Sequence, residues 1–99
     1  MAAELIVAPE AERDLAEAYA WYEDQRVGLG EEFLGCVDAC IATLCRTPEM
    51  CAEVYESYRR ALVRRFPYAV FYEYAEGTVT VYSVFHTSQN PEKWIRRLS

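Results

Sequence analysis

Several features that would point directly to a function are scarce or absent in this sequence. Its apolar runs fall well short of the roughly 20 residues of a membrane-spanning helix, and its first residues lack the basic start and apolar stretch of a signal peptide. The 99 residues contain no Gly-, Ser- or Pro-rich linker and no internal repeat. We therefore expect a cytoplasmic protein with no membrane partner, folded as one domain over residues 1–99.

Positive charge is also scarce, above all in the first half. The formal net charge is −6, and Lys93 is the only lysine. Residues 1–50 carry three basic and eleven acidic residues, whereas residues 51–99 carry seven basic and five acidic ones. The first half therefore repels nucleic acid, while the second half offers a local basic patch. This distribution argues against a general nucleic-acid binder, and we expect no direct DNA binding.

The four cysteines do not follow the spacing of a metal site. Cys36, Cys40, Cys45 and Cys51 contain no Cys-x-x-Cys pair, and the only histidine, His86, lies far away in sequence. Free cysteine packs as a small apolar side chain, and cytosolic proteins keep their thiols reduced. We therefore expect free thiols, no metal ion and no cofactor.

The first half predicts a short strand followed by two helices. Leu5-Ile6-Val7 is apolar and β-branched, as in a strand, and Pro9 then suits a first helical position. This helix should end near Arg26, and a second should run from about Glu31 until Thr47-Pro48 ends it. The apolar stripes consist of Ala11, Leu15, Ala18 and Tyr22 in the first helix, and of Phe33, Val37, Cys40, Ile41 and Leu44 in the second.

The second half predicts three antiparallel strands, at residues 54–63, 68–74 and 78–85, and a last helical turn within residues 90–98. The fold class is α+β in the order β-α-α-β-β-β, with an antiparallel helical hairpin packed on one face of a small antiparallel sheet. Nothing left in the chain could cover the other face, which would carry tyrosines and arginines. Such an amphipathic surface indicates a protein partner.

A cluster of arginines surrounds the strand at residues 54–63. Arginine binds carboxylate or phosphate through two parallel hydrogen bonds, although the same charges also protect a strand edge from aggregation. Arg59 and Arg60 must point to opposite faces, so all four arginines cannot serve one site. Tyr72 could instead be core with Val70, and Trp94 an anchor for the tail. The expected partner-binding residues are Arg59, Arg60, Arg64, Arg65, Tyr68, Tyr72, Trp94, Arg96 and Arg97.

His86 closes the last predicted strand and is the one candidate for acid–base chemistry. With a reference pKa of about 6.5, a histidine can act as general acid or base, and Arg60 or Arg65 could then neutralise a phosphate in a ribonuclease. The alternative is a strand-end histidine that hydrogen-bonds the loop at residues 87–89. Because no carboxylate partner is evident, no catalytic residue is assigned firmly.

The order of several short motifs resembles the RelE/ParE superfamily of small bacterial toxins, the toxic half of toxin–antitoxin pairs. Asp14-Leu15 and Tyr19…Trp21-Tyr22 are similar to the opening helix of that family, Leu29-Gly30…Phe33 to its hairpin turn, Arg60…Phe66-Pro67-Tyr68…Tyr72 to its strand pair, and His86…Pro91…Trp94 to the ending of the ParE-like, plasmid-stabilisation branch. The resemblance implies the helical hairpin on an antiparallel sheet that the periodicity also predicts.

The resemblance also implies partners. A cognate antitoxin binds such toxins with an extended or helical tail, which is often acidic, and a homodimer or a heterotetramer with the antitoxin is the expected assembly. ParE-like toxins inhibit DNA gyrase, whereas RelE-like toxins cleave messenger RNA on the ribosome with a basic-rich site and often a late tyrosine. The acidic chain, the scarcity of lysine and the lack of a tyrosine after His86 favour the ParE-like branch. Gln89 departs from that branch, which often has arginine there, so a non-toxic member that only binds its partner is a further alternative.

Overall fold

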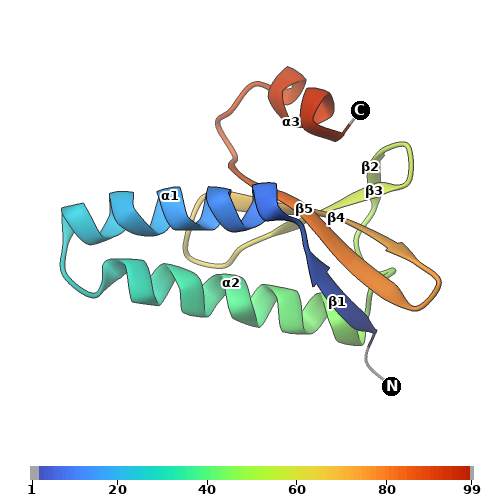
Figure 1. Cartoon of the computed structure of the whole chain (residues 1–99), viewed down its shortest axis with the longest axis horizontal. Helices are drawn as coiled ribbons and strands as arrows, with labels where there is room; N and C mark the ends of the chain where they lie inside the picture. The colour runs from blue at the N-terminus through green and yellow to red at the C-terminus, as the bar shows by residue number, and fades with distance from the viewer. Residues whose placement is uncertain (1–2, 99) are drawn as a thin grey trace.

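The computed structural model describes residues 3–98, and it confirms the predicted order of a strand, two helices, further strands and a short last helix (Figure 1). The elements are β1 (Glu4–Val7), α1 (Pro9–Gln25), α2 (Leu29–Arg46), β2 (Glu53–Tyr55), β3 (Tyr58–Leu62), β4 (Tyr68–Ala75), β5 (Thr78–His86) and α3 (Pro91–Leu98). The strands form one sheet in the order β1-β5-β4-β3-β2. The fold is therefore α+β, as predicted.

The sheet differs from the prediction in two details. Residues 54–63, predicted as one strand, contain most of the hairpin of β2 and β3, because the chain reverses at Glu56, whose φ of 51° is left-handed. In addition, β1 pairs in parallel with β5, with Leu5 opposite Val79, whereas the sequence predicts an antiparallel sheet. Parallel pairing needs a long crossover connection, which the two helices and the intervening strands supply.

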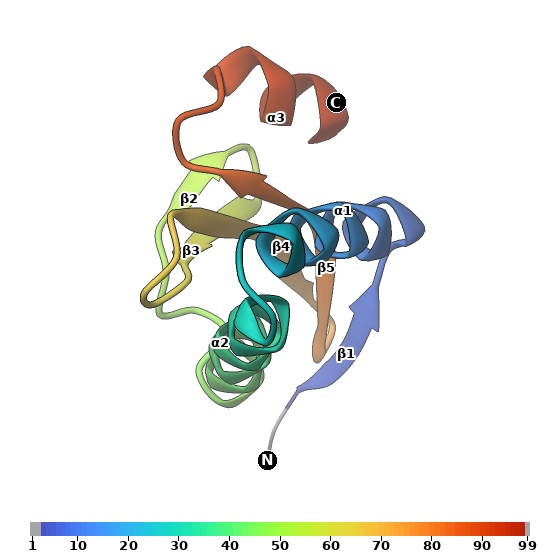
Figure 2. The same cartoon turned by 90° about the vertical axis from the view of Figure 1, so that its left-hand side faces the viewer.

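α1 and α2 form an antiparallel hairpin on one face of the sheet (Figure 2). The turn between them needs glycine at position 28, because Gly28 has a φ of 89°. The carboxylate of Glu23 closes this turn by accepting hydrogen bonds from the backbone N–H groups of Gly28, at 3.0 Å, and Gly30, at 2.9 Å. The Glu23 side chain of α1 thus fixes the start of α2. The apolar stripes of both helices face the strands.

Aromatic rings fill one end of the core between the helices and the sheet. The ring centroids of Tyr22 and Phe33 lie 5.2 Å apart, and Phe66 lies 5.0 Å from the first and 5.4 Å from the second. Tilted and edge-on pairs of this kind are favoured by the ring quadrupoles. Because Phe66 belongs to the loop between β3 and β4, its burial holds that loop, with Arg64 and Arg65, beside α2.

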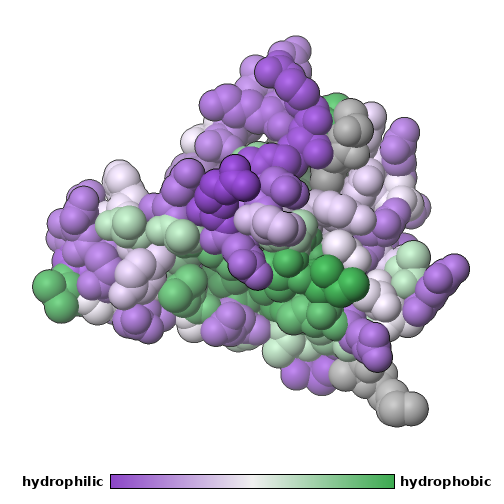
Figure 3. Space-filling view, viewed as in Figure 1, coloured by the Kyte–Doolittle hydropathy of each residue, from purple (hydrophilic) through white to green (hydrophobic). Residues whose placement is uncertain are grey.

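The outer surface of the hairpin carries apolar side chains as well. Figure 3 shows a band of hydrophobic residues that runs from the helices toward β1, where Leu5 and Ile6 are 45% and 54% exposed. A shallow groove lies between Leu15 of α1 and Leu34 of α2. Among residues 3–98, no helix combines the length and the apolar character needed to cross a membrane.

Candidate partner-binding site

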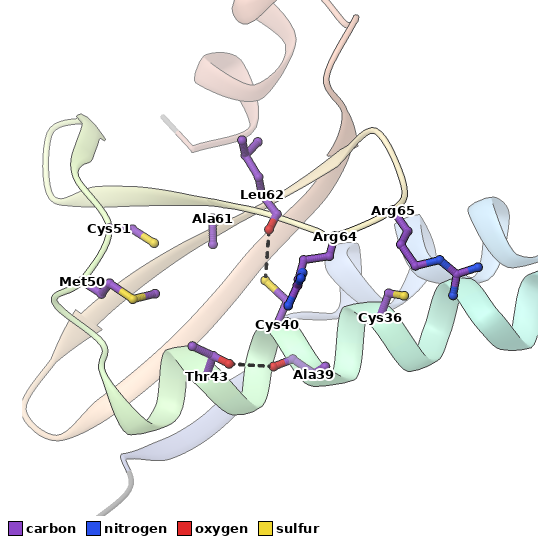
Figure 4. A pocket seen from close by; sticks show the side chains of 10 residues that line it. All are labelled: Cys36, Ala39, Cys40, Thr43, Met50, Cys51, Ala61, Leu62, Arg64 and Arg65. Carbon is purple, nitrogen blue, oxygen red and sulfur yellow. Dashed lines mark hydrogen bonds between the residues drawn. The ribbon is translucent and has the colours of Figure 1, made fainter.

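A groove of about 510 Å³ lies between α2 and β3 (Figure 4). The chain leading to β2 closes one end with Met50 and Cys51, and the β3–β4 loop closes the other with Arg64 and Arg65. Its size falls within the range of about 300–1,000 Å³ that is typical of ligand pockets. Along its length the lining residues are Cys36, Ala39, Cys40 and Thr43 of α2, and Ala61 and Leu62 of β3. The groove therefore has an apolar middle and one basic end.

The strand that borders this groove is only partly covered. β2 pairs with Tyr58 and Arg59, and within the described residues its register extends no further along β3. The N–H of Val63 donates to the carbonyl of Tyr68 in β4, at 2.9 Å. Since backbone groups alternate in direction along a strand, the amide and carbonyl of Leu62 point away from β4, toward the groove. Among the described residues, the outer edge of β3 at Leu62 thus pairs with no strand and faces the groove and α2.

Three of the four thiols line the groove, and each is half-buried and not in a disulfide. Burial, with a smaller contribution from the nearby thiol of Cys51, raises the pKa of Cys40 to about 11. Cys40 therefore stays a neutral thiol near neutral pH and contributes as a small apolar side chain. Its sulfur lies 3.9 Å from the carbonyl oxygen of Leu62, which places α2 directly against the outer edge of β3.

The two arginines at the basic end differ in their contacts. Arg65 donates to the carboxylate of Glu32 at 2.9 Å, and Arg26 binds the same carboxylate at 3.0 Å. The hydrogen bond from Arg65, followed by that from Arg26, lowers the pKa of Glu32. Arg64 has no ion pair with any residue that the structure describes, and its side chain lines the same groove as Cys40 (Figure 4). Arg64 is therefore the cation available to a carboxylate from outside.

Arg59 and Arg60 have different environments. The guanidinium of Arg59 is half-buried and donates to the carbonyl oxygens of Cys51 and, at 3.3 Å, Glu49. It thus holds the connection that closes the groove. Arg60 is exposed and lies opposite Phe71 of β4, on the sheet face opposite the helical hairpin. Of this pair, only Arg60 presents its charge to a partner.

The sheet face opposite the helical hairpin, called the uncovered face although Arg97 of α3 reaches it at Phe85, is aromatic. The rings of Tyr58 and Tyr82 meet edge-on at 5.3 Å, and those of Phe71 and Phe85 lie 6.2 Å apart. The hydroxyl of Tyr82 is 3.5 Å from the carboxylate of Glu73, which also accepts a hydrogen bond from Ser57. The face therefore combines the buried ring of Phe71 and the half-buried rings of its other aromatic residues with Arg60 at its edge, a composition typical of protein interfaces.

Two tyrosines expected to bind a partner lie mainly inside the fold. Tyr72 is completely buried, and its hydroxyl donates to the carbonyl of Pro48 at 2.9 Å. Burial raises its pKa, so the phenol remains a neutral donor. Tyr68 is half-buried, with its ring 5.0 Å from Phe33 and 5.3 Å from His86. Tyr72 therefore belongs to the core with Val70 and offers no surface to a partner.

Asp14 is a connecting residue that the sequence analysis named only as part of a motif and gave no role. Its carboxylate accepts the backbone N–H of Val84 in β5 at 3.0 Å and pairs with Arg97 of α3 at 3.1 Å. The guanidinium of Arg97 also lies 4.7 Å from the ring centroid of Phe85. Arg97 therefore fastens α3 to the body, although both it and Arg96 are exposed; the side chain of Trp94 lies outside the described residues. An aspartate beside the apolar stripe of a helix was the available signal.

The candidate ribonuclease residues do not meet. His86 accepts a hydrogen bond from the Ser88 N–H at its Nδ1, at 3.1 Å, and lies beside Tyr68 on the helix-covered side of the sheet. Arg60 lies on the opposite face, and Arg65 pairs with Glu32 near α2. Within residues 3–98, no group of three or more histidine, cysteine or acidic side chains could hold a metal ion. His86 therefore lies apart from both predicted arginines, and among the described residues the cation that lines the same groove as His86 is Arg97, which pairs with Asp14.

Comparison with known proteins identifies the family. A family model described as "ParE toxin of type II toxin-antitoxin system, parDE" matches residues 5–91. The chain belongs to the ParE toxin family. The RelE/ParE resemblance that the motifs indicated is thereby confirmed, and the chain is a toxin-type component of a toxin–antitoxin system. A search of curated proteins found no match.

Two solved structures share the ParE-type fold. One is described as the chromosomal ParDE toxin–antitoxin system from P. aeruginosa; it has a TM-score of 0.78 and 12% identity, covering 87% of this chain and 97% of the other. The second is E. coli toxin RelE, a double arginine-to-alanine mutant in the free state, with a TM-score of 0.62 and 16% identity over 99% of this chain and 96% of that one. At sequence identities this low, the likeness to these two structures shows only that the fold is shared.

Proposed function

We propose that this chain is a toxin that a cognate antitoxin neutralises and that its cellular target is DNA gyrase. The match of residues 5–91 to ParE toxins carries this proposal. The gyrase target follows from the ParE-like branch, and the antitoxin from the toxin–antitoxin system in which that family acts. Surface chemistry is consistent with a protein partner, because Arg60 and Arg64 are exposed beside apolar and aromatic side chains.

The separation of the candidate catalytic residues supports gyrase over messenger RNA as the target. A ribonuclease that uses the RNA 2′-hydroxyl needs its general base and its phosphate-binding cation at one phosphate. Here His86 and Arg60 lie on opposite faces of the sheet. Arg65 is committed to Glu32, and Arg97, which lines the same groove as His86, is committed to Asp14.

Pulse-labelling of DNA and protein synthesis in the minutes after induction of the chain alone tests this proposal. DNA synthesis should fall first while translation continues, and purified chain should inhibit supercoiling by purified gyrase. His86→Ala should retain toxicity, because the histidine has no catalytic role in this reading. Co-expression of the antitoxin is the control and should restore both syntheses.

The other outcomes identify the alternatives. An immediate fall in protein synthesis that His86→Ala abolishes would establish a ribosome-dependent ribonuclease and exclude the gyrase proposal. If neither synthesis falls although the chain is expressed and binds its antitoxin, the chain is a binding partner without toxicity, in keeping with Gln89 at a position where arginine is frequent in the ParE-like branch.

A further inference from the structure

We infer that the groove between α2 and β3 is a site of reversible thiol modification, in which Cys36 forms a mixed disulfide with a small thiol that carries carboxylates. This property goes beyond the proposed toxicity and does not depend on the cellular target. It follows from the thiol at the basic end of the groove, from the arginines beside that thiol and from the room that the groove offers.

The thiol of Cys36 lies at the basic end of the groove, beside the β3–β4 loop. In Figure 4 its sulfur points toward the guanidinium of Arg65. The hydrogen bond to Glu32, followed by the interaction with Cys36, raises the pKa of Arg65, so the sulfur and the guanidinium are close neighbours. Cys36 is also half-buried and not in a disulfide. Cysteines that react with disulfides typically lie in such electropositive, partly exposed surroundings.

The basic end keeps a net positive charge although a carboxylate lies nearby. Arg65 and Arg26 share the carboxylate of Glu32, at 2.9 and 3.0 Å, so one of their two charges is left over. Arg64 adds a further charge, without an ion pair among the described residues. No acidic side chain is among the described residues that line the groove. A reagent with carboxylates is therefore attracted toward Cys36 and can bind Arg64 through them.

The groove also has room for a group attached to Cys36. Its volume of about 510 Å³ lies within the range that holds small ligands. Its middle is lined by the short side chains of Ala39 and Ala61 (Figure 4). A thiol of the size of a short peptide can therefore lie along the groove, with its sulfur bonded to Cys36 and its carboxylates at Arg64.

The reaction is a thiol–disulfide exchange. The thiolate of Cys36 attacks one sulfur of the small disulfide, so that a new sulfur–sulfur bond forms at Cys36 while the original bond breaks. The other half leaves as a thiolate and takes up a proton. The sulfur of Cys36 is oxidised and the departing sulfur is reduced, so the small disulfide is itself the oxidant. An excess of the reduced small thiol reverses the reaction.

The other two thiols of the groove are less suited to this exchange. Burial raises the pKa of Cys40 to about 11. Near neutral pH it therefore stays a thiol and does not readily displace the small thiol from Cys36 to form an internal disulfide. Cys51 lies at the other end of the groove, where the guanidinium of Arg59 is committed to the carbonyl oxygens of Cys51 and Glu49. The mixed disulfide at Cys36 is therefore the expected product.

Disulfides of different charge test this inference on the unmodified chain. The chain is incubated near pH 8 with anionic glutathione disulfide, neutral bis(2-hydroxyethyl) disulfide or cationic cystamine, and mass spectrometry follows each cysteine. Each rate is divided by that of the same cysteine in the urea-unfolded chain, which removes intrinsic differences between the reagents. The ratio at Cys36 should be at least about tenfold higher for glutathione disulfide than for cystamine, and high salt should reduce the difference. Cys45, which lies outside the groove, should show no such preference.

Arg64→Gln tests the basic end of the groove. It should remove most of the preference for glutathione disulfide at Cys36 and leave the reaction with the neutral disulfide unchanged. Arg13→Gln, the same change at an exposed arginine of α1, is the matched control and should alter neither rate.

Equal rate ratios for the three disulfides at Cys36 would mean that the groove does not bind carboxylates, and the inference would be wrong. An internal disulfide between Cys36 and Cys40 as the main product, or faster reaction at Cys51, would overturn it as well. None of these results bears on toxicity, which pulse-labelling decides separately.

Discussion

At the residue scale, Tyr72 links the core to the wall of the groove. Its ring is completely buried, and its hydroxyl binds the carbonyl of Pro48, in the connection that continues to Met50 and Cys51. Arg59 holds the same connection through the carbonyl of Cys51. In the sequence, both residues lie in strands whose side chains alternate between the two faces, so either side chain could equally well lie on the surface. Only the burial and the two hydrogen bonds reveal that both side chains support the groove from inside.

Tyr72→Phe should therefore destabilise the fold by about 1 kcal/mol, the usual net contribution of one hydrogen bond. The loss should appear as a lower urea midpoint with an unchanged slope, since the surface exposed on unfolding stays the same. Tyr82→Phe is the matched control, because its hydroxyl makes only a long, 3.5 Å contact with Glu73. Equal shifts for the two variants would mean that the hydroxyl of Tyr72 does not stabilise the connection.

At the scale of elements, the close approach of α1 and α2 depends on Gly30. A Cβ atom at this position would lie 2.8 Å from the backbone oxygen of Tyr19 and 2.7 Å from the Cγ of Glu23. Gly35 is also in α2, yet a Cβ there would meet nothing within 4 Å. The two glycines thus occupy the same helix with opposite steric surroundings.

Gly30→Ala should lower stability by about 1–3 kcal/mol, because the backbone oxygen of Tyr19 cannot move aside without separating the helices. Gly35→Ala should raise stability by about 0.5–1 kcal/mol, because alanine is the better residue in an exposed helix interior. Thermal unfolding followed by circular dichroism compares the two. A melting temperature that rises for both variants would contradict the close helix contact at Gly30.

The helices were predictable because their apolar spacing and their glycine and proline boundaries are local signals. The pairing of the strands was harder to predict from the sequence. The hairpin within residues 53–62 depends on Glu56 in a left-handed conformation, which the residue type does not announce. The parallel pairing of β1 with β5 joins segments more than 70 residues apart, and Leu5-Ile6-Val7 would look the same in either orientation. Long-range register is therefore the part of the fold that the sequence leaves open.

At the scale of the whole molecule, the uneven charge of the sequence becomes a separation in space. The first half, with its eleven acidic residues, supplies the helical hairpin, and the basic residues of the second half gather at β3, its loop and α3. The sequence predicted this basic cluster and the opposite directions of Arg59 and Arg60. It could not predict which arginines are committed internally, because Glu32 and the carbonyl of Cys51 approach them only in the fold.

This separation makes Arg60 the residue at which charge reversal should affect association and not folding. Arg60 is exposed and lies at the edge of the uncovered face, so Arg60→Glu should leave the melting temperature nearly unchanged. The affinity for the antitoxin should fall by about tenfold, mainly through slower association, because exposed charges steer the encounter of the partners. The same variant should also show a weaker salt dependence of the association rate. Arg13→Glu, an identical charge change on the exposed surface of α1, is the control. If both variants associate at the rate of the unmodified chain, the antitoxin does not approach along this edge of the sheet.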